Sequence, residues 1–128
     1  MTKARLPISL FLAFAPFAAA ASEFAVPRNS SREIDNWGAI NEDCTPLGAT
    51  VVTLQSPPRH GAVQIKFGHD HPTFPASNPR SACNAHAIAS TQAWYRPAAG
   101  YVGPDSVTFD IVYPNGYSSQ FTIAILVR

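Results

Sequence analysis

Apolar side chains recur at every second position in two segments near the end of this chain, Ser106 to Tyr113 and Ser119 to Val127. A period of two residues is that of a β-strand with one buried face. Between them, Asn115 and Gly116 tolerate the positive φ angles of a primed turn, which predicts a hairpin. A further strand is expected at Thr91 to Arg96, and no comparable stretch has the period of 3.6 of an amphipathic helix. The pattern therefore predicts an all-β fold.

Two more strands are predicted in the middle of the chain. Thr50 to Gln55 is rich in β-branched residues, and Ala62 to Phe67 alternates with Val63, Ile65 and Phe67 on one face. The segment between them is rich in proline and ends in glycine, as a tight connection requires. Several short strands separated by such turn residues are typical of a β-sandwich or a barrel.

The first residues have the composition of a secretory signal peptide. Lys3 and Arg5 precede an apolar run, which is followed by small residues up to position 22. The run is shorter than the roughly 20 residues that a membrane-spanning helix needs. We therefore expect a signal peptide at residues 1–21, a flexible arm at 22–31 and one domain at 32–128, located in the periplasm or outside the cell, with no integral membrane anchor after cleavage.

The charge balance restricts the class of partner. The chain has nine Lys and Arg residues and eight Asp and Glu residues. Removal of Lys3 and Arg5 with the signal peptide would leave seven basic against eight acidic residues, a net charge of −1. Binding of nucleic acid calls for clustered cations that neutralise phosphates, and polybasic membrane attachment requires the same. Neither is expected, and a protein or another component of the cell envelope remains as the partner.

The two cysteines, Cys44 and Cys83, lie 39 positions apart. An even number of cysteines in an exported chain predicts a disulfide, which would stabilise the fold by about 4 kcal/mol on the chain-entropy model. The alternative is a redox-active or metal-bound thiol pair, although their spacing is far from Cys-x-x-Cys.

A long loop is predicted from Gly68 to Ser90, because this segment contains three prolines and little alternation. It also contains His69, His71 and His86, and histidine nitrogens suit copper or zinc in an exported protein. The alternative interpretation is a polar loop whose histidines are solvated. No other cofactor is expected.

A set of glycines, prolines and aromatic residues has a spacing found in a known family. The chain resembles, from about Val51 to Val127, the immunoglobulin-like and cadherin-like repeats of bacterial surface and secreted proteins. This resemblance implies a Greek-key sandwich that serves structure or adhesion and brings no catalytic residues. The residues that carry it are Pro58, Gly61, Val63, Tyr95, Pro97, Gly100, Tyr101, Gly103, Asp105, Ser106 and Phe109.

The same residues have a physical interpretation without any ligand. Gly100 and Gly103 suit a turn with unusual φ angles, Asp105 can accept backbone N–H bonds there, and Phe109 or Tyr101 can fill the core. The sequence contains neither Gly-x-Ser-x-Gly nor His-Glu-x-x-His. We therefore expect a non-catalytic, immunoglobulin-like module with a structural, adhesive or protein-binding role. The alternative is a small periplasmic metal-binding protein.

Overall fold

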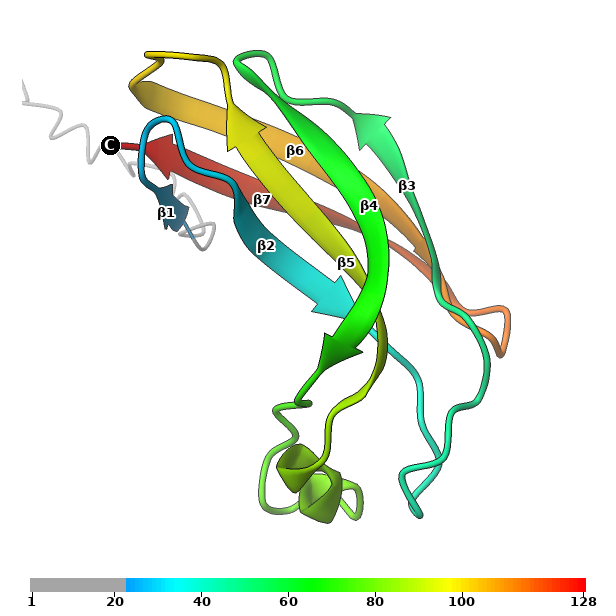
Figure 1. Ribbon diagram of the computed structural model, residues 1–128. Coiled ribbons are helices and arrows are strands. Elements are labelled where there is room, and N and C mark those ends of the chain that lie inside the picture. Colours follow the sequence, from blue (N-terminus) through cyan, green and yellow to red (C-terminus); the bar gives the residue numbers. More distant parts are fainter. Residues whose placement is uncertain (1–22) are drawn as a thin grey trace, which may run out of the picture.

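The computed structural model describes residues 23–128, so the predicted signal peptide lies outside the described residues. This part of the chain forms strands and one short 3-10 helix, η1 (Figure 1). In chain order the elements are β1 (Glu23–Val26), β2 (Arg32–Trp37), β3 (Val51–Ser56), β4 (Gly61–Asp70), η1 (Ser81–Ala85), β5 (Ile88–Pro97), β6 (Gly103–Val112) and β7 (Ser118–Val127).

The strands form two sheets that face each other. One sheet has the order β1-β7-β6-β3 and the other has the order β2-β5-β4. Pairing is antiparallel everywhere except between β1 and β7, which run parallel. Apart from the short β1, the division into three strands and three strands follows the two sheets of an immunoglobulin domain. The predicted all-β, immunoglobulin-like sandwich is confirmed.

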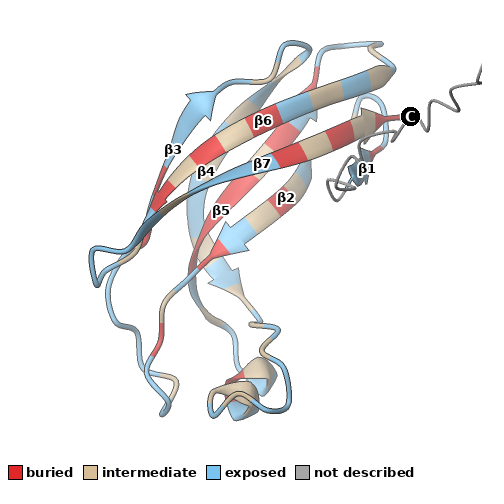
Figure 2. Ribbon diagram, turned by 180° about the vertical axis from the view of Figure 1, so that it is seen from behind, coloured by how far each residue is buried: buried red, intermediate tan, exposed pale blue. Residues whose placement is uncertain are grey.

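The core lies between the sheets and is built from alternate residues of the central strands. Tyr95, Val107 and Phe109 are fully buried, and the ring of Trp37 meets that of Phe109 edge to face at 5.1 Å between centroids. Figure 2 shows buried positions concentrated in β5, β6 and β7, whereas β3 and β4 are largely exposed. Burial of the apolar face of each central strand is what holds the sheets together.

The five predicted strands are all present, but β4 and β5 are longer than expected. They pair without interruption from Gly61 to Asp70, so the loop predicted at 68–90 shrinks to residues 71–87. Gly68 allows this extension because the side chain of Gln92 lies across it. A Cβ at position 68 would come within 2.5 Å of the Gln92 Nε2 atom.

Two strands near the start of the chain were not predicted. The flexible arm expected at 22–31 contains β1, in which Val26 is fully buried. A hydrogen bond of 2.7 Å from the Arg28 N–H to the Arg128 carbonyl continues this pairing. In β2, a register shift at residues 33–35 places the two buried residues, Ile34 and Trp37, three positions apart. This bulge breaks the period of two, which is why the alternation failed to reveal the strand.

The hairpin between β6 and β7 is also different from the prediction. Gly116 has a φ of +85°, but Asn115 is not among the residues with positive φ. The N–H of Tyr113 donates to the carbonyl of Tyr117 at 2.8 Å, and the N–H of Gly116 donates to the carbonyl of Tyr113 at 2.9 Å. The connection is therefore a three-residue loop with glycine in the left-handed region, rather than a primed two-residue turn.

Candidate functional site

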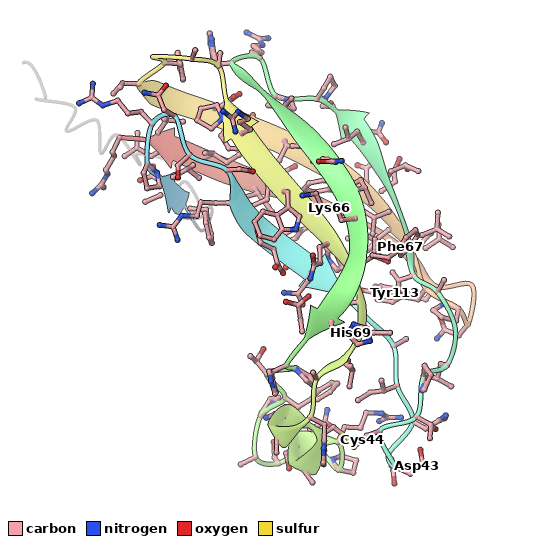
Figure 3. The ribbon with its side chains drawn as sticks, in the orientation of Figure 1. Asp43, Cys44, Lys66, Phe67, His69 and Tyr113 are labelled. Atoms are coloured by element: carbon pink, nitrogen blue, oxygen red, sulfur yellow. A yellow bond between two sulfur atoms is a disulfide. The ribbon has the colours of Figure 1, made fainter. Side chains whose placement is uncertain are left out.

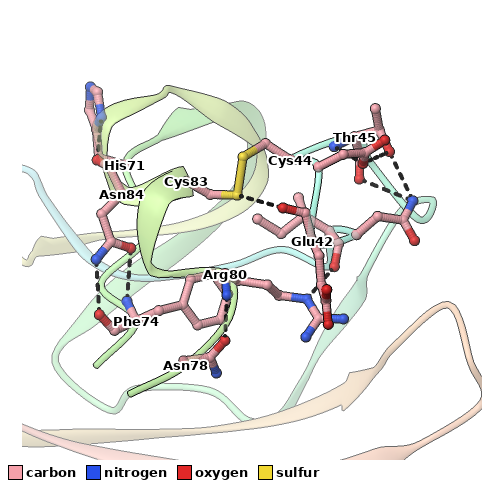
Figure 4. The surroundings of a disulfide bond; sticks show 12 residues. Glu42, Cys44, Thr45, His71, Phe74, Asn78, Arg80, Cys83 and Asn84 are labelled. Atoms are coloured by element: carbon pink, nitrogen blue, oxygen red, sulfur yellow. Dashed lines mark hydrogen bonds between the residues drawn. A yellow bond between two sulfur atoms is a disulfide. The ribbon is translucent and has the colours of Figure 1, made fainter. Parts of the chain in front are cut away.

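One end of the sandwich is formed by the two longest connections of the described chain, residues 38–50 and 71–87. A disulfide between Cys44 and Cys83 joins them, with the two Cα atoms 5.5 Å apart (Figure 4). The predicted pairing of the cysteines is confirmed. Cys83 is fully buried and belongs to η1, so the disulfide fixes that helix against the connection between β2 and β3.

Hydrogen bonds add to this attachment. The Arg80 Nε donates to the Ile40 carbonyl at 2.9 Å and thereby crosses from one connection to the other. Within the second connection, the Asn84 side chain bonds both the N–H and the carbonyl of Phe74, each at 2.9 Å. These side-chain hydrogen bonds satisfy backbone N–H and C=O groups that would be paired with a neighbouring strand in a sheet. The two connections therefore form one fixed wall.

Beside this wall, an apolar groove of about 370 Å³ opens between the three-stranded sheet and the connection that leads into β3. Every strand of the three-stranded sheet contributes to it, together with the residues that lead into β3. Two aromatic side chains, Trp37 and Phe67, are its largest apolar members. The lining residues are Trp37, Gly38, Pro46, Gly48, Ala49, Thr50, Phe67, Gly68, His69, Ala89, Ser90 and Thr91.

Phe67 is the most exposed large apolar residue of the described chain, at 82% of its full accessible surface. It belongs to the same face of β4 as Val63 and Ile65, which pack against the core. Figure 3 shows Phe67 extending from β4 toward the side of β3, while Lys66 extends the opposite way. The predicted face of Phe67 is thus correct, but its side chain lies where the core ends. An exposed aromatic side chain beside an apolar groove is typical of a binding surface.

The three histidines that the sequence suggested as metal ligands are divided between separate cavities. His69 and His86 line a second cavity of about 470 Å³ next to Cys44. His71 lines a third cavity of about 260 Å³, and its Nδ1 lies 3.1 Å from the Asn84 carbonyl oxygen. Within residues 23–128, no three His, Cys, Asp or Glu side chains come together as a metal site requires.

Asp105 and its hydrogen-bond partners, which include residues of the Gly, Pro and aromatic motif, lie at the opposite end of the sandwich and join its two sheets. The Asp105 carboxylate accepts hydrogen bonds from the N–H of Arg59 at 3.0 Å and of His60 at 3.1 Å. It also accepts one from the Tyr95 hydroxyl at 2.7 Å. Partial burial alone would raise the pKa of Asp105, but these bonds, together with one from the N–H of Ser106, hold it below its usual value. Burial, and then the bond to Asp105, raise the pKa of Tyr95.

The other motif residues also have structural roles, most of them at the same end. A Cβ on Gly61 would come within 2.6 Å of the Arg96 carbonyl oxygen and 2.7 Å of the Tyr95 ring. Gly100 and Gly103 have φ angles of +76° and +139°. Pro97 pairs with Gly61 at the end of β5, Phe109 is in the core, and the Tyr101 hydroxyl donates to the Pro104 carbonyl at 2.6 Å. These contacts give the motif a structural role.

A polar network that the sequence did not reveal covers the outer face of the three-stranded sheet. The Trp94 Nε1 donates to the Gln92 Oε1 and the Gln92 Nε2 donates to the Asp70 Oδ2, both at 2.9 Å. The Ser90 hydroxyl also donates to Asp70. Burial alone would raise the pKa of Asp70, but these bonds lower it, whereas burial and the neighbouring Asp70 raise the pKa of Glu33. Two of these side chains, those of Ser90 and Asp70, were expected in a loop, so their common face was missed.

Comparisons with known proteins assign this chain to no family. No family model matches the chain, and no curated protein matches it. A solved structure with detectable similarity is the solution structure of amebosin, with a TM-score of 0.43 and 8% sequence identity over 84% of this chain and 89% of amebosin. In the described part of the chain, no helix has the length and apolar character needed to cross a membrane.

Proposed function

We propose that this chain is an exported, non-catalytic module that binds a protein partner at the groove beside Phe67 and serves adhesion or the structure of the cell envelope. The disulfide between Cys44 and Cys83 fits an oxidising compartment, as does the signal-like start of the sequence. The resemblance of the Gly, Pro and aromatic spacing to repeats of bacterial surface proteins agrees with the same role.

The observation that carries the proposal is the exposure of Phe67 at the mouth of a groove with fixed walls. An aromatic side chain that is 82% exposed gains little from folding, whereas it would gain substantially from being covered by a partner. The disulfide and the Arg80 hydrogen bond hold the connection of residues 38–50, which lines one side of the groove, and thereby reduce the entropy that binding must overcome.

The test compares the mature protein with two serine variants. Phe67→Ser removes the aromatic side chain at the groove. Val102→Ser is the matched control, because Val102 is also exposed, at 53%, but lies in the connection between β5 and β6 at the other end of the sandwich. Each protein is used to isolate partners from an envelope extract, and the partner is then purified and titrated. We expect Phe67→Ser to raise the dissociation constant at least tenfold and Val102→Ser to leave it unchanged.

Two outcomes would contradict the proposal. The first is that every partner isolated from the envelope extract binds the wild type and the Phe67→Ser variant with equal affinity. The second is that a chelator abolishes binding and tag-free protein holds copper or zinc that His69→Ala with His71→Ala removes, which would favour the metal-binding alternative.

A further inference from the structure

β4 is the outermost strand of the three-stranded sheet, and one of its edges is open. It pairs with β5 along its whole length of ten residues without a register shift. No other segment within residues 23–128 forms a backbone ladder with it. An open edge presents unpaired N–H and C=O groups, to which an extended polypeptide can add as a further strand.

The register identifies the backbone groups on this edge. The N–H of Ala98 donates to the carbonyl of His60, the residue opposite it, at 2.8 Å. The next pair along the ladder, Gly61 and Pro97, is therefore a non-hydrogen-bonded pair. The two pair types alternate along an antiparallel ladder, so the even-numbered residues of β4 bond to β5. The groups of the odd-numbered residues point away from β5, and these are Gly61, Val63, Ile65, Phe67 and His69.

Apart from Gly61, these odd-numbered residues direct their side chains to one face of β4, the face that packs on the core at Val63 and Ile65. Val63 and Ile65 pack against the core, and Phe67 and His69 line the groove. Residues opposite one another in paired strands point to the same face of the sheet. An added strand would therefore direct every second side chain inward, and the residue opposite Phe67 would reach the mouth of the groove. Apolar residues suit these positions.

Charged side chains in the segment that contains β3 and most of β4 have one sign. Residues 51–69, which contain β3 and nearly all of β4, include Arg59 and Lys66 and no Asp or Glu. Lys66 lies on the outer face of β4, where its Nζ is 4.9 Å from the centre of the Trp94 ring. Asp70, at the end of β4, already accepts hydrogen bonds from the network on that face. An added strand with acidic side chains on its outer face would therefore be attracted to Lys66.

We propose that the open edge of β4 binds an extended acidic segment of another polypeptide by strand addition. Alternate apolar side chains of that segment enter the groove beside Phe67, and the intervening Asp or Glu side chains lie next to Lys66. This inference rests on the proposed function and specifies the chemistry of the partner at the same site. A second copy of this chain is a poorer occupant, because pairing of two β4 edges would bring two Lys66 ammonium groups onto one sheet.

The test uses pools of synthetic ten-residue peptides and backbone amide exchange measured by NMR. One pool alternates apolar residues with glutamate, and a second replaces glutamate by lysine. A third has the composition of the first in non-alternating order, and a fourth is the first with N-methylated backbone amides. We expect the first pool alone to slow the exchange of the Val63, Ile65 and Phe67 amide protons at least tenfold.

Charge variants test the role of Lys66. In Lys66→Glu, the preference should shift from the glutamate pool to the lysine pool. Arg28→Glu is the matched control, because it makes the same change of net charge at an exposed residue next to the last residue of the chain. In this control the preference should remain that of the wild type.

Three results would overturn the inference. These are no slowing at the three amides with millimolar glutamate pool, equal slowing by the N-methylated or non-alternating pool, and protection in the free protein that rises with its own concentration. The last result would assign the edge to a second copy. The proposed function has a separate readout: a partner that depends on Phe67 but leaves these amides unprotected would preserve the function and refute strand addition.

Discussion

The Tyr95 hydroxyl donates a hydrogen bond of 2.7 Å to the Asp105 carboxylate, and Tyr95 is fully buried. Because Asp105 also accepts the N–H groups of Arg59 and His60, one carboxylate joins β5, β6 and the connection between β3 and β4. These hydrogen bonds account for the position of the Asp105 carboxylate without an acid–base role. It makes the carboxylate a structural junction between the two sheets.

Loss of this junction should destabilise the protein at neutral pH. We expect Tyr95→Phe to lower the free energy of unfolding by about 1.5 kcal/mol, because one hydrogen bond to a charged group is lost. Asp105→Ala should cost about 3 kcal/mol, because the buried Tyr95 hydroxyl and three backbone N–H groups lose their acceptor. Urea unfolding of both single variants and the double variant provides the test. Additive effects in the double variant would contradict a direct coupling.

The same hydrogen bond predicts a dependence of stability on pH at both extremes. The folded state lowers the pKa of Asp105, so its contribution is present above the unfolded value of about 3.9 and is lost as the pH falls through the folded value. The folded state raises the pKa of Tyr95, so its contribution is complete below about pH 10 and is lost as the pH rises through the folded value. Tyr95→Phe should therefore lose less stability than the wild type above pH 10, and Asp105→Asn should lose less below pH 4.

Two glycine variants separate steric contact from backbone conformation. Gly61→Ala should destabilise by about 3 kcal/mol, because the added Cβ meets the Arg96 carbonyl and the Tyr95 ring. Gly100→Ala should cost only about 1 kcal/mol, because its φ of +76° is unfavourable for alanine but no atom lies within 4 Å of the new Cβ. Thermal unfolding measures both, and the reverse order of the two effects would refute this assignment.

Removal of the disulfide should affect both global stability and the groove wall. Cys44→Ala with Cys83→Ala should lower the free energy of unfolding by about 4 kcal/mol, because the unfolded chain regains the entropy of an open loop. Amide exchange in residues 71–87 should accelerate more than in β6. The wild type under reducing conditions is the control and should show the same pattern.

Truncation should destabilise the protein strongly at Phe109 and hardly at Phe67. Phe109 is fully buried, so Phe109→Ala should cost about 4 kcal/mol through lost contacts and a cavity. Phe67 is 82% exposed, so Phe67→Ala should change the free energy of unfolding by less than about 0.5 kcal/mol. A large destabilisation by Phe67→Ala, measured by urea unfolding, would show that Phe67 supports the fold instead of a partner.

β6 and β7 could be predicted from the sequence because the apolar residues of each recur at every second position on one buried face. β2 was not predicted because its bulge separates the buried residues Ile34 and Trp37 by three positions. β1 was not predicted because it has only four residues, of which Val26 alone is buried. The ends of β4 and β5 were assigned to a loop because residues 68–90 contain three prolines and little alternation. The strand continues through Gly68, and the side chain of Gln92 lies across that glycine.

The candidate site was harder to predict than the fold. Alternation placed Phe67 on the inward face but could not show that this face continues beyond the core. The groove depends on residues far apart in the sequence, such as Pro46 and Ala89, which only the folded chain brings together. The sequence identified the histidines as possible metal ligands from their residue type alone. Their positions in separate cavities depend on how the loop folds, which the sequence pattern does not reveal.

The parallel pairing of β1 with β7 determines how the module responds to mechanical load. Tension between residue 23 and residue 128 pulls the two strands lengthwise in opposite directions, because they run the same way in the sheet. All hydrogen bonds of the pair then bear the force together, instead of opening one after another as in a hairpin pulled from its ends. Under such a load the pair resists as one unit until its hydrogen bonds break together.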